Sequence, residues 1–249
     1  MKVGRIFGNH FWRWLATVFF VFVVLLLNAG CSSVHEMALK PGATTLDIKK
    51  ASVCLFSLKT ENKFKPDWPP EVYGIEIINK ETNEKIKIAV QSMATGTLLK
   101  KAFSDAFTVN KGSSSWEGLI SFQLPPGSYH LSAIRGGCAK GIGIVVGMAS
   151  FDFPFDIPFQ VENGECVYMG RIEMTNRERV SDDEIPSGDN LITRLPQRHS
   201  GFGTGTFDVK IYDNFDQDIQ RFKEKYPVLS NQVIKKRILP QWKKPENRS

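Results

Sequence analysis

The sequence predicts a mainly β fold that ends in a short helical pair, and three observations support this prediction. The apolar runs after the first 30 residues are short, and 20 glycines and 13 prolines are spread along the chain, which suits strands and turns. Residues 151–159 alternate strictly between large apolar side chains and other residues, as a half-buried strand does. Residues 119–134 place two further apolar runs around Pro125-Pro126-Gly127, which indicates a strand, a tight turn and a second strand.

Residues 1–30 are predicted to be a secretory signal peptide. Lys2, Arg5 and Arg13 stand in its first part without any acidic residue, and an apolar run extends from Trp14 to Leu27. A stable membrane span needs about 20 apolar residues, whereas the apolar region of a signal peptide has about 7 to 15. The run therefore favours a cleaved signal over a membrane-spanning helix.

Asn28-Ala29-Gly30-Cys31 resembles the lipobox of bacterial lipoproteins, with Asn28 where that motif usually has Leu, Val or Ile. The resemblance implies that Cys31 is the lipidation site and the first residue of the mature protein, and that the membrane is a partner through this lipid. Ser32 stands where an aspartate would indicate inner-membrane retention, so the implied location is the outer membrane, facing the periplasm. The alternatives are an ordinary cleaved signal with a chance cysteine, or an uncleaved anchor.

From Cys31 onwards the chain is long enough for one large domain or two small ones, and it is only mildly basic. Its net charge falls from +6 to +3 without residues 1–30, which is too little to indicate nucleic acid as a partner. Cys54, Cys138 and Cys166 lie at no C-x-x-C spacing, so the sequence does not support a zinc or redox motif. Either all three are buried free thiols, or two form a disulfide and one stays free.

Residues 31–45 are predicted to be a lipidated tether, because Lys40-Pro41-Gly42 stands among few large apolar residues. The β domain is predicted to cover residues 46–213. In it, the polar residues 79–84 connect two strands as a hairpin, and the charged residues 175–205 form an exposed loop. Residues 93–106 suit a short helix or an irregular strand equally. The predicted strands are residues 51–58, 72–78, 86–90, 119–124, 129–134, 151–159 and 207–212.

The segment Leu124-Pro125-Pro126-Gly127-Ser128-Tyr129-His130-Leu131 resembles the L-P-P-G-x-Y-x-L hairpin of prealbumin-like and related immunoglobulin-like β-sandwich modules. Residues 163–170 resemble a segment of uncharacterised bacterial lipoproteins of that type, in which an aromatic strand follows a glycine turn. The resemblance covers about residues 51–213. It implies an antiparallel β-sandwich and carries over no active site.

Residues 151–159 are also the candidate binding segment. Its apolar face includes Phe151, Phe153 and Phe155. Prolines 154 and 158 place it at a sheet edge or outside the sheet, because proline cannot donate to a strand ladder. One interpretation is an edge protected by proline and negative charge. The other is a binding edge for another envelope protein, with these three phenylalanines as binding residues.

Residues 214–239 are predicted to be helical. Asp213 or Asn214 is the N-cap of a first helix that Pro227 ends, and Ser230 caps a second helix that reaches Ile238. The apolar stripe of the first helix is formed by Ile219, Phe222 and Tyr226. Residues 240–249 are predicted to be a solvated basic tail. In the alternative interpretation, Trp242 with Lys243 and Lys244 rests on anionic lipid headgroups.

The chain has no sequence motif of a hydrolase, a zinc enzyme or a phosphate loop. The glycines of residues 141–147 match a nucleotide-binding pattern only superficially, and Asp182-Asp183-Glu184 lacks the spacing of a calcium loop. We therefore expect a non-enzymatic binding or structural module without cofactor or metal. Two alternatives remain: an envelope enzyme, if His130, His199, Asp182 and Glu184 meet in a pocket, and a carrier of small apolar ligands between the sheets.

Overall fold

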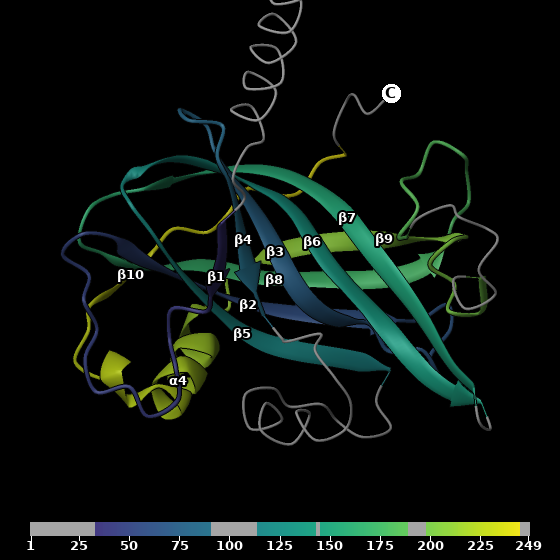
Figure 1. The fold of residues 1–249 in the computed structure, drawn as a ribbon, viewed down its shortest axis with the longest axis horizontal. Coiled ribbons are helices and arrows are strands. Elements are labelled where there is room, and N and C mark those ends of the chain that lie inside the picture. The colour runs from purple at the N-terminus through teal and green to yellow at the C-terminus, as the bar shows by residue number, and fades with distance from the viewer. Residues whose placement is uncertain (1–32, 91–113, 143–144, 189–197, 245–249) are drawn as a thin grey trace, which may run out of the picture. The chain divides into compact units, whose positions relative to one another are not determined.

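The computed structural model describes residues 33–90, 114–142, 145–188 and 198–244, and its strands form two mixed sheets (Figure 1). Sheet 1 has the order β1 (Ser33–Glu36), β4 (Lys85–Ala89), β3 (Glu71–Asn79), β6 (Gly127–Ile142) and β7 (Val145–Val161). Sheet 2 has the order β10 (Ile234–Lys236), β8 (Cys166–Glu178), β2 (Ser52–Asn62) and β5 (Ser115–Leu124), and β9 (Gly205–Tyr212) also pairs with β8. Helix α4 (Phe215–Lys225) and the 3-10 turn η1 (Pro227–Leu229) follow β9. The prediction of a mainly β fold is confirmed.

The sheets are mixed because the chain leaves sheet 2 and re-enters it at the same end. β5 runs antiparallel to β2 and ends with Leu124 opposite Ser52. The chain then runs out along β6 in sheet 1, returns along the antiparallel β7, and enters β8. β8 therefore starts beside the start of β2 and pairs with it in parallel, with Val53 opposite Cys166. Because β1·β4 and β10·β8 are parallel as well, the prediction of antiparallel sheets is wrong.

The inner faces of both sheets supply one hydrophobic core. Phe56 of β2 and Phe122 of β5 contact each other edge to face, with ring centroids 6.1 Å apart. Across the core, Phe151 and Phe153 of β7 meet Phe207 of β9 at 5.0 and 5.4 Å. Aromatic rings from both sheets therefore contact one another directly in the core.

The structure confirms the elements that were predicted from strictly local patterns. β3 and β4 pair as the predicted hairpin, and their turn contains Asn83 in a left-handed conformation with φ of 57°. This conformation suits asparagine better than most residues. α4 starts after Asn214 and presents Ile219 and Phe222 to a second buried cluster on sheet 2, as its apolar stripe predicted.

The Pro125-Pro126-Gly127 turn has a different role from the predicted one. It follows β5 and precedes β6 as expected, but these strands lie in different sheets, so the turn connects the two sheets instead of closing a hairpin. The alternation along β6 also changes, because the pairing with β3 shifts at Ser132. As a result Ile134, which strict alternation would place on the same face as His130, is fully buried in the core.

The chain after η1 forms a strand instead of the predicted second helix. Its backbone pairs with sheet 2: β10 lies parallel to β8, Arg237 N–H donates to the carbonyl of Tyr168 at 2.9 Å, and Leu239 N–H donates to that of Met169 at 2.9 Å. The sheet edge therefore supplies partners that a short isolated helix would lack. The helical pair is corrected to one helix followed by a strand.

Residues 237–242 continue as a C-terminal strap that reaches sheet 1. Beyond Leu239, the Gln241 side chain bonds with the backbone of Ile211 in β9. The Trp242 indole then packs at 5.4 Å from the Phe153 ring and donates to the Pro154 carbonyl at 3.1 Å. The strap thus joins the edge strands β9 and β7, and this part of the predicted solvated tail is packed against the protein.

The predicted tether is likewise part of the fold from Ser33 onwards. β1 pairs with β4 in sheet 1, and the Ala38 and Leu39 N–H groups donate to the backbone and side chain of Ser121 in sheet 2, each at 3.0 Å. Leu39 is buried against α4 and sheet 2. The N-terminal segment 33–39 therefore joins the sheets on the side opposite the strap, and the tether prediction is corrected.

The segment predicted as a long exposed loop is shorter and partly packed. β8 continues to Glu178, where its last residues pair with the start of β9. Ser187 is buried and its hydroxyl donates to Asn176, while Phe202 belongs to the core. The unassigned residues 93–106 lie outside the described residues, as do residues 189–197 of this loop.

The three described cysteines are buried free thiols. Burial raises the pKa of Cys138 and of Cys166 to about 12, and it raises that of Cys54 as well. A buried neutral thiol is a poor nucleophile because only the thiolate reacts. The sequence left open either three free thiols or one disulfide and one free thiol, and the structure has three free thiols.

We expect these thiols to resist alkylation in the folded protein at pH 8, and the protein to lose stability between about pH 9 and 12. A folded pKa above the unfolded value of about 8.5 gives stability that is complete below this value and declines as pH rises towards the folded pKa. Peptide mapping after iodoacetamide treatment tests the first point, with urea-unfolded protein as the positive control. Urea unfolding across this pH range tests the second. Rapid alkylation of a native thiol contradicts the assignment.

Candidate functional site

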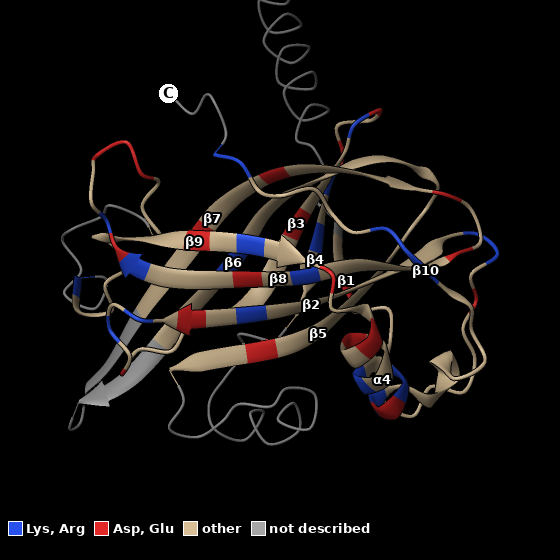
Figure 2. Ribbon diagram, turned by 180° about the vertical axis from the view of Figure 1, so that it is seen from behind, with Lys and Arg blue, Asp and Glu red and all other residues tan. Residues whose placement is uncertain are grey.

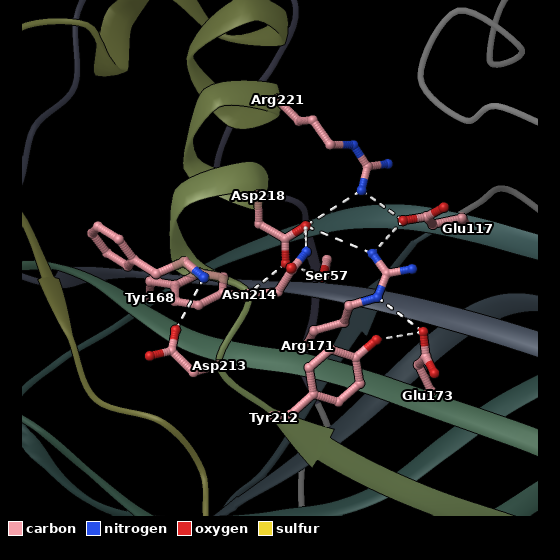
Figure 3. A network of polar contacts seen from close by, with 11 residues as sticks. Ser57, Glu117, Tyr168, Arg171, Glu173, Tyr212, Asp213, Asn214, Asp218 and Arg221 are labelled. Atoms are coloured by element: carbon pink, nitrogen blue, oxygen red, sulfur yellow. Dashed lines mark hydrogen bonds and ion pairs between the residues drawn. The ribbon is translucent and has the colours of Figure 1, made fainter.

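The most extensive polar cluster lies where α4 packs on the outer face of sheet 2, and Asp218 of α4 is at its centre (Figure 3). The Asp218 carboxylate is completely buried. It accepts a hydrogen bond from the Ser57 hydroxyl of β2, and another from the Tyr168 hydroxyl of β8 at 2.6 Å. Asn214, before the helix, donates its amide to the same carboxylate at 3.1 Å. A buried charge of this kind is stable only with such donors around it.

Two arginines complete the neutralisation of Asp218. Arg221, one turn along α4, and Arg171 of β8 lie 3.4 and 3.7 Å from Asp218 Oδ1. Both also donate to Glu117 Oε1 of β5, each at 2.6 Å. Burial raises the pKa of Glu117, but the hydrogen bonds from Arg171 and Arg221 outweigh it, so the pKa lies below its usual value. Glu117 and Asp218 are thus joined through shared guanidinium groups.

The network ends at Glu173 and Tyr212 on the solvent side. Glu173 Oε1 accepts from Arg171 Nε at 3.1 Å and from the Tyr212 hydroxyl at 2.6 Å. Burial, followed by the bond to Glu173, raises the pKa of Tyr212 to about 12. Both groups therefore keep their ordinary protonation at neutral pH.

The chemistry that this network supports is structural. Its carboxylates are paired with arginines, and proton transfer at neutral pH needs a group whose pKa is close to 7. We infer that the network fastens α4 to sheet 2 in one orientation, because a buried carboxylate with directional donors fits only one arrangement.

The sequence analysis did not identify Asp218 as a site residue, although its position in the helix indicates one. It lies four residues before Phe222 and next to Ile219, so it is on the apolar stripe of the helix. A charged residue on such a stripe indicates a buried partner. Its partners come from strands far away in the sequence, and no local pattern contains them.

Two residues of the network, Glu117 and Glu173, also belong to a row of charges of alternating sign on sheet 2 (Figure 2). The strand register places Glu117, Lys59, Glu173 and Lys210 in one row across β5, β2, β8 and β9. Opposite charges on neighbouring strands attract each other and stay hydrated. A balanced row of this kind offers no patch of one sign for a polyanion.

The predicted binding residues Phe151, Phe153 and Phe155 lie inside the core, each with 2 % or less of its surface exposed. β7 is an edge strand, as its prolines predicted. Its side chains alternate between buried and exposed except at Pro154, which is buried between Phe153 and Phe155 where the register with β6 shifts. The three rings therefore do not form an exposed contact surface. A partner at this edge would meet the backbone of β7 and outward residues such as Asp152.

The residues of the alternative enzyme site are not brought together. His130 of β6 pairs with Asp156 of β7 at 2.5 Å. His199 is exposed in the segment between residue 198 and the start of β9. Glu184 is bound by Arg177, whose hydrogen bonds lower the pKa of Glu184 to about 2, and Asp182 lies 3.7 Å from Arg179. Within the described ranges, no group of three His, Cys, Asp or Glu side chains is placed to hold a metal ion.

The fold and the network define a mainly β protein with two mixed sheets and a helix held by buried ion pairs. Comparisons with protein families, with curated protein sequences and with solved structures found no match for this chain. The lipidation candidate Cys31 lies outside the described residues. Among the helices in the described part of the chain, none has the length and apolar character to cross a bilayer.

Proposed function

We propose that this protein is a lipid-anchored envelope protein whose β-sandwich body, of the prealbumin-like or immunoglobulin-like kind, is a non-enzymatic binding or structural module. The observation that carries the proposal is the position of Cys31. It follows the apolar run Trp14 to Leu27 after only Asn28-Ala29-Gly30, and the compact unit of the fold starts two residues later, at Ser33. Cleavage before Cys31 would release the whole body with its lipidated residue at the new N-terminus.

Several features of the body support this proposal. The free cysteines are buried with raised pKa values, which protects thiols in an oxidising compartment such as the periplasm. The carboxylates of the polar network are held by arginines, as in a structural cluster. The Phe151 and Phe202 rings pack against each other in the core, with their centroids 5.4 Å apart. Such packing favours a filled core over a cavity that would carry an apolar ligand. Ser32 supports an outer-membrane location facing the periplasm.

Replacing Cys31 with alanine is expected to abolish lipid labelling and to move the protein from the membrane fraction to the soluble envelope fraction. Metabolic labelling with a tagged palmitate, followed by fractionation and mass spectrometry of the N-terminal peptide, measures both effects. Cys138→Ala is the matched control, because it removes a buried thiol and should leave labelling unchanged. If the Cys31→Ala protein stays labelled and membrane-bound, the proposed anchor is wrong.

A further inference from the structure

We propose that one end of the two-sheet body, the end at which β1 starts, lies directly on the lipid headgroups of the membrane. This inference rests on the proposed lipid anchor at Cys31. Ser33 is already paired with Ile86 in sheet 1, so only Ser32 stands between the anchor residue and the sheet. Two peptide units reach at most about 7 Å. The chain therefore has no spacer that would hold the body away from the bilayer.

The surface at this end, which we call the anchor end, includes three turns. Residues 80–84 connect β3 to β4 beside Ser33, since Ile86 pairs with both Ser33 and Ile77. The Pro125-Pro126-Gly127 turn is adjacent, because Lys80 N–H donates to the carbonyl of Ser128 at 2.9 Å. Residues 162–165 follow, because Val161 pairs with Gly127.

The chemistry of the anchor end suits headgroups and not the hydrocarbon interior. Residues 80–85 are all exposed and polar, and Lys80 and Lys85 stand at the two ends of this turn. Two acidic groups of the same end are directed to the protein: Glu81 accepts from the Ser128 N–H at 3.1 Å, and Glu162 pairs with Arg237 at 2.7 Å. Lys80 and Lys85 are balanced by Glu81 and Glu84, so the turn is polar without net charge, which suits contact with headgroups.

The opposite end of the body is then far from the membrane. β8 leaves the anchor end at Cys166 and extends for 13 residues to Glu178. At about 3.3 Å per residue, a strand of this length carries the chain roughly 40 Å away. The exposed loop at Ser181 follows immediately. A label at Thr82 and one at Ser181 should therefore report very different distances to the headgroups.

The test uses the full-length lipidated protein in vesicles that carry a fluorescent acceptor on the headgroups. Thr82→Cys and Ser181→Cys are labelled with a donor dye, and the buried native thiols do not compete at pH 7 because their pKa values are raised. We expect energy transfer from position 82 to be several-fold more efficient than from position 181. Equal efficiencies at the two positions would overturn the inference.

A matched control inserts about ten Gly and Ser residues between Ser32 and Ser33. Such a flexible linker has a mean reach of about 17 Å, so the difference between the two labels should shrink. Flotation of the vesicles separates the two proposals. Protein that does not float, with an unmodified Cys31 by mass spectrometry, refutes the anchor itself, and the inference with it. Protein that floats with equal transfer from both positions refutes only the direct contact.

Discussion

Replacing Asp218 with alanine is expected to lower the free energy of unfolding by about 3 to 5 kcal/mol, which is typical of removing one partner from a buried ion pair. The change leaves the Ser57 and Tyr168 hydroxyls without their acceptor in a buried place. It also leaves Arg171, whose side chain is 11 % exposed, with one fewer counter-charge. Urea unfolding followed by circular dichroism measures the loss.

The control for this experiment is Asp216→Asn, in the same first turn of α4. Asp216 is exposed, so its change should cost no more than about 0.5 kcal/mol. Asp218→Asn should fall between the two, because the amide keeps one oxygen acceptor but loses the charge. If Asp218→Ala is no more destabilising than Asp216→Asn, the network does not fasten α4 to the sheet.

Replacing Phe153 with alanine is expected to destabilise the protein by about 3 to 5 kcal/mol, because the large side chain is completely buried and leaves a cavity. Phe153 contacts Phe155, Phe207 and Trp242, so its loss loosens the core and the C-terminal strap together. Urea unfolding followed by circular dichroism gives the free energy.

Phe159→Ala is the comparison for Phe153, because it lies on the same strand and is only partly buried. We expect about half the loss in this variant. Equal losses of unfolding free energy in the two variants would show that the deeper burial of Phe153 does not determine its contribution to stability. The result also bears on binding studies. Because substitutions at Phe153 act on stability, binding at β7 is better tested with an outward residue such as Asp152.

The sequence predicts well those elements whose signal is contained in the element itself. The alternation of β7, the hairpin of β3 and β4, and the stripe of α4 each depend on residues that are close in the chain. β1 and β10 are short and weakly patterned, and they are strands because a neighbouring strand offers hydrogen bonds. Local patterns do not encode such partners.

The same reason explains the turn at Pro125-Pro126-Gly127 and the site around Asp218. Proline and glycine determine that the chain turns, but the sheet in which the next strand pairs depends on tertiary packing. The network needs β2, β5, β8 and α4 at once, and these elements are spread over most of the chain. From the sequence alone, only the buried position of Asp218 could have been predicted, because it lies on the apolar stripe of α4.

The arrangement of the two terminal segments has a consequence for the order in which the protein is made and folded. Segment 33–39 joins the sheets on one side, and the strap that ends at Trp242 joins them on the other. The strap can close the β7 side only after residues 237–242 have been made and β9 has paired with β8, so we expect this closure to follow the pairing of the strands in both sheets.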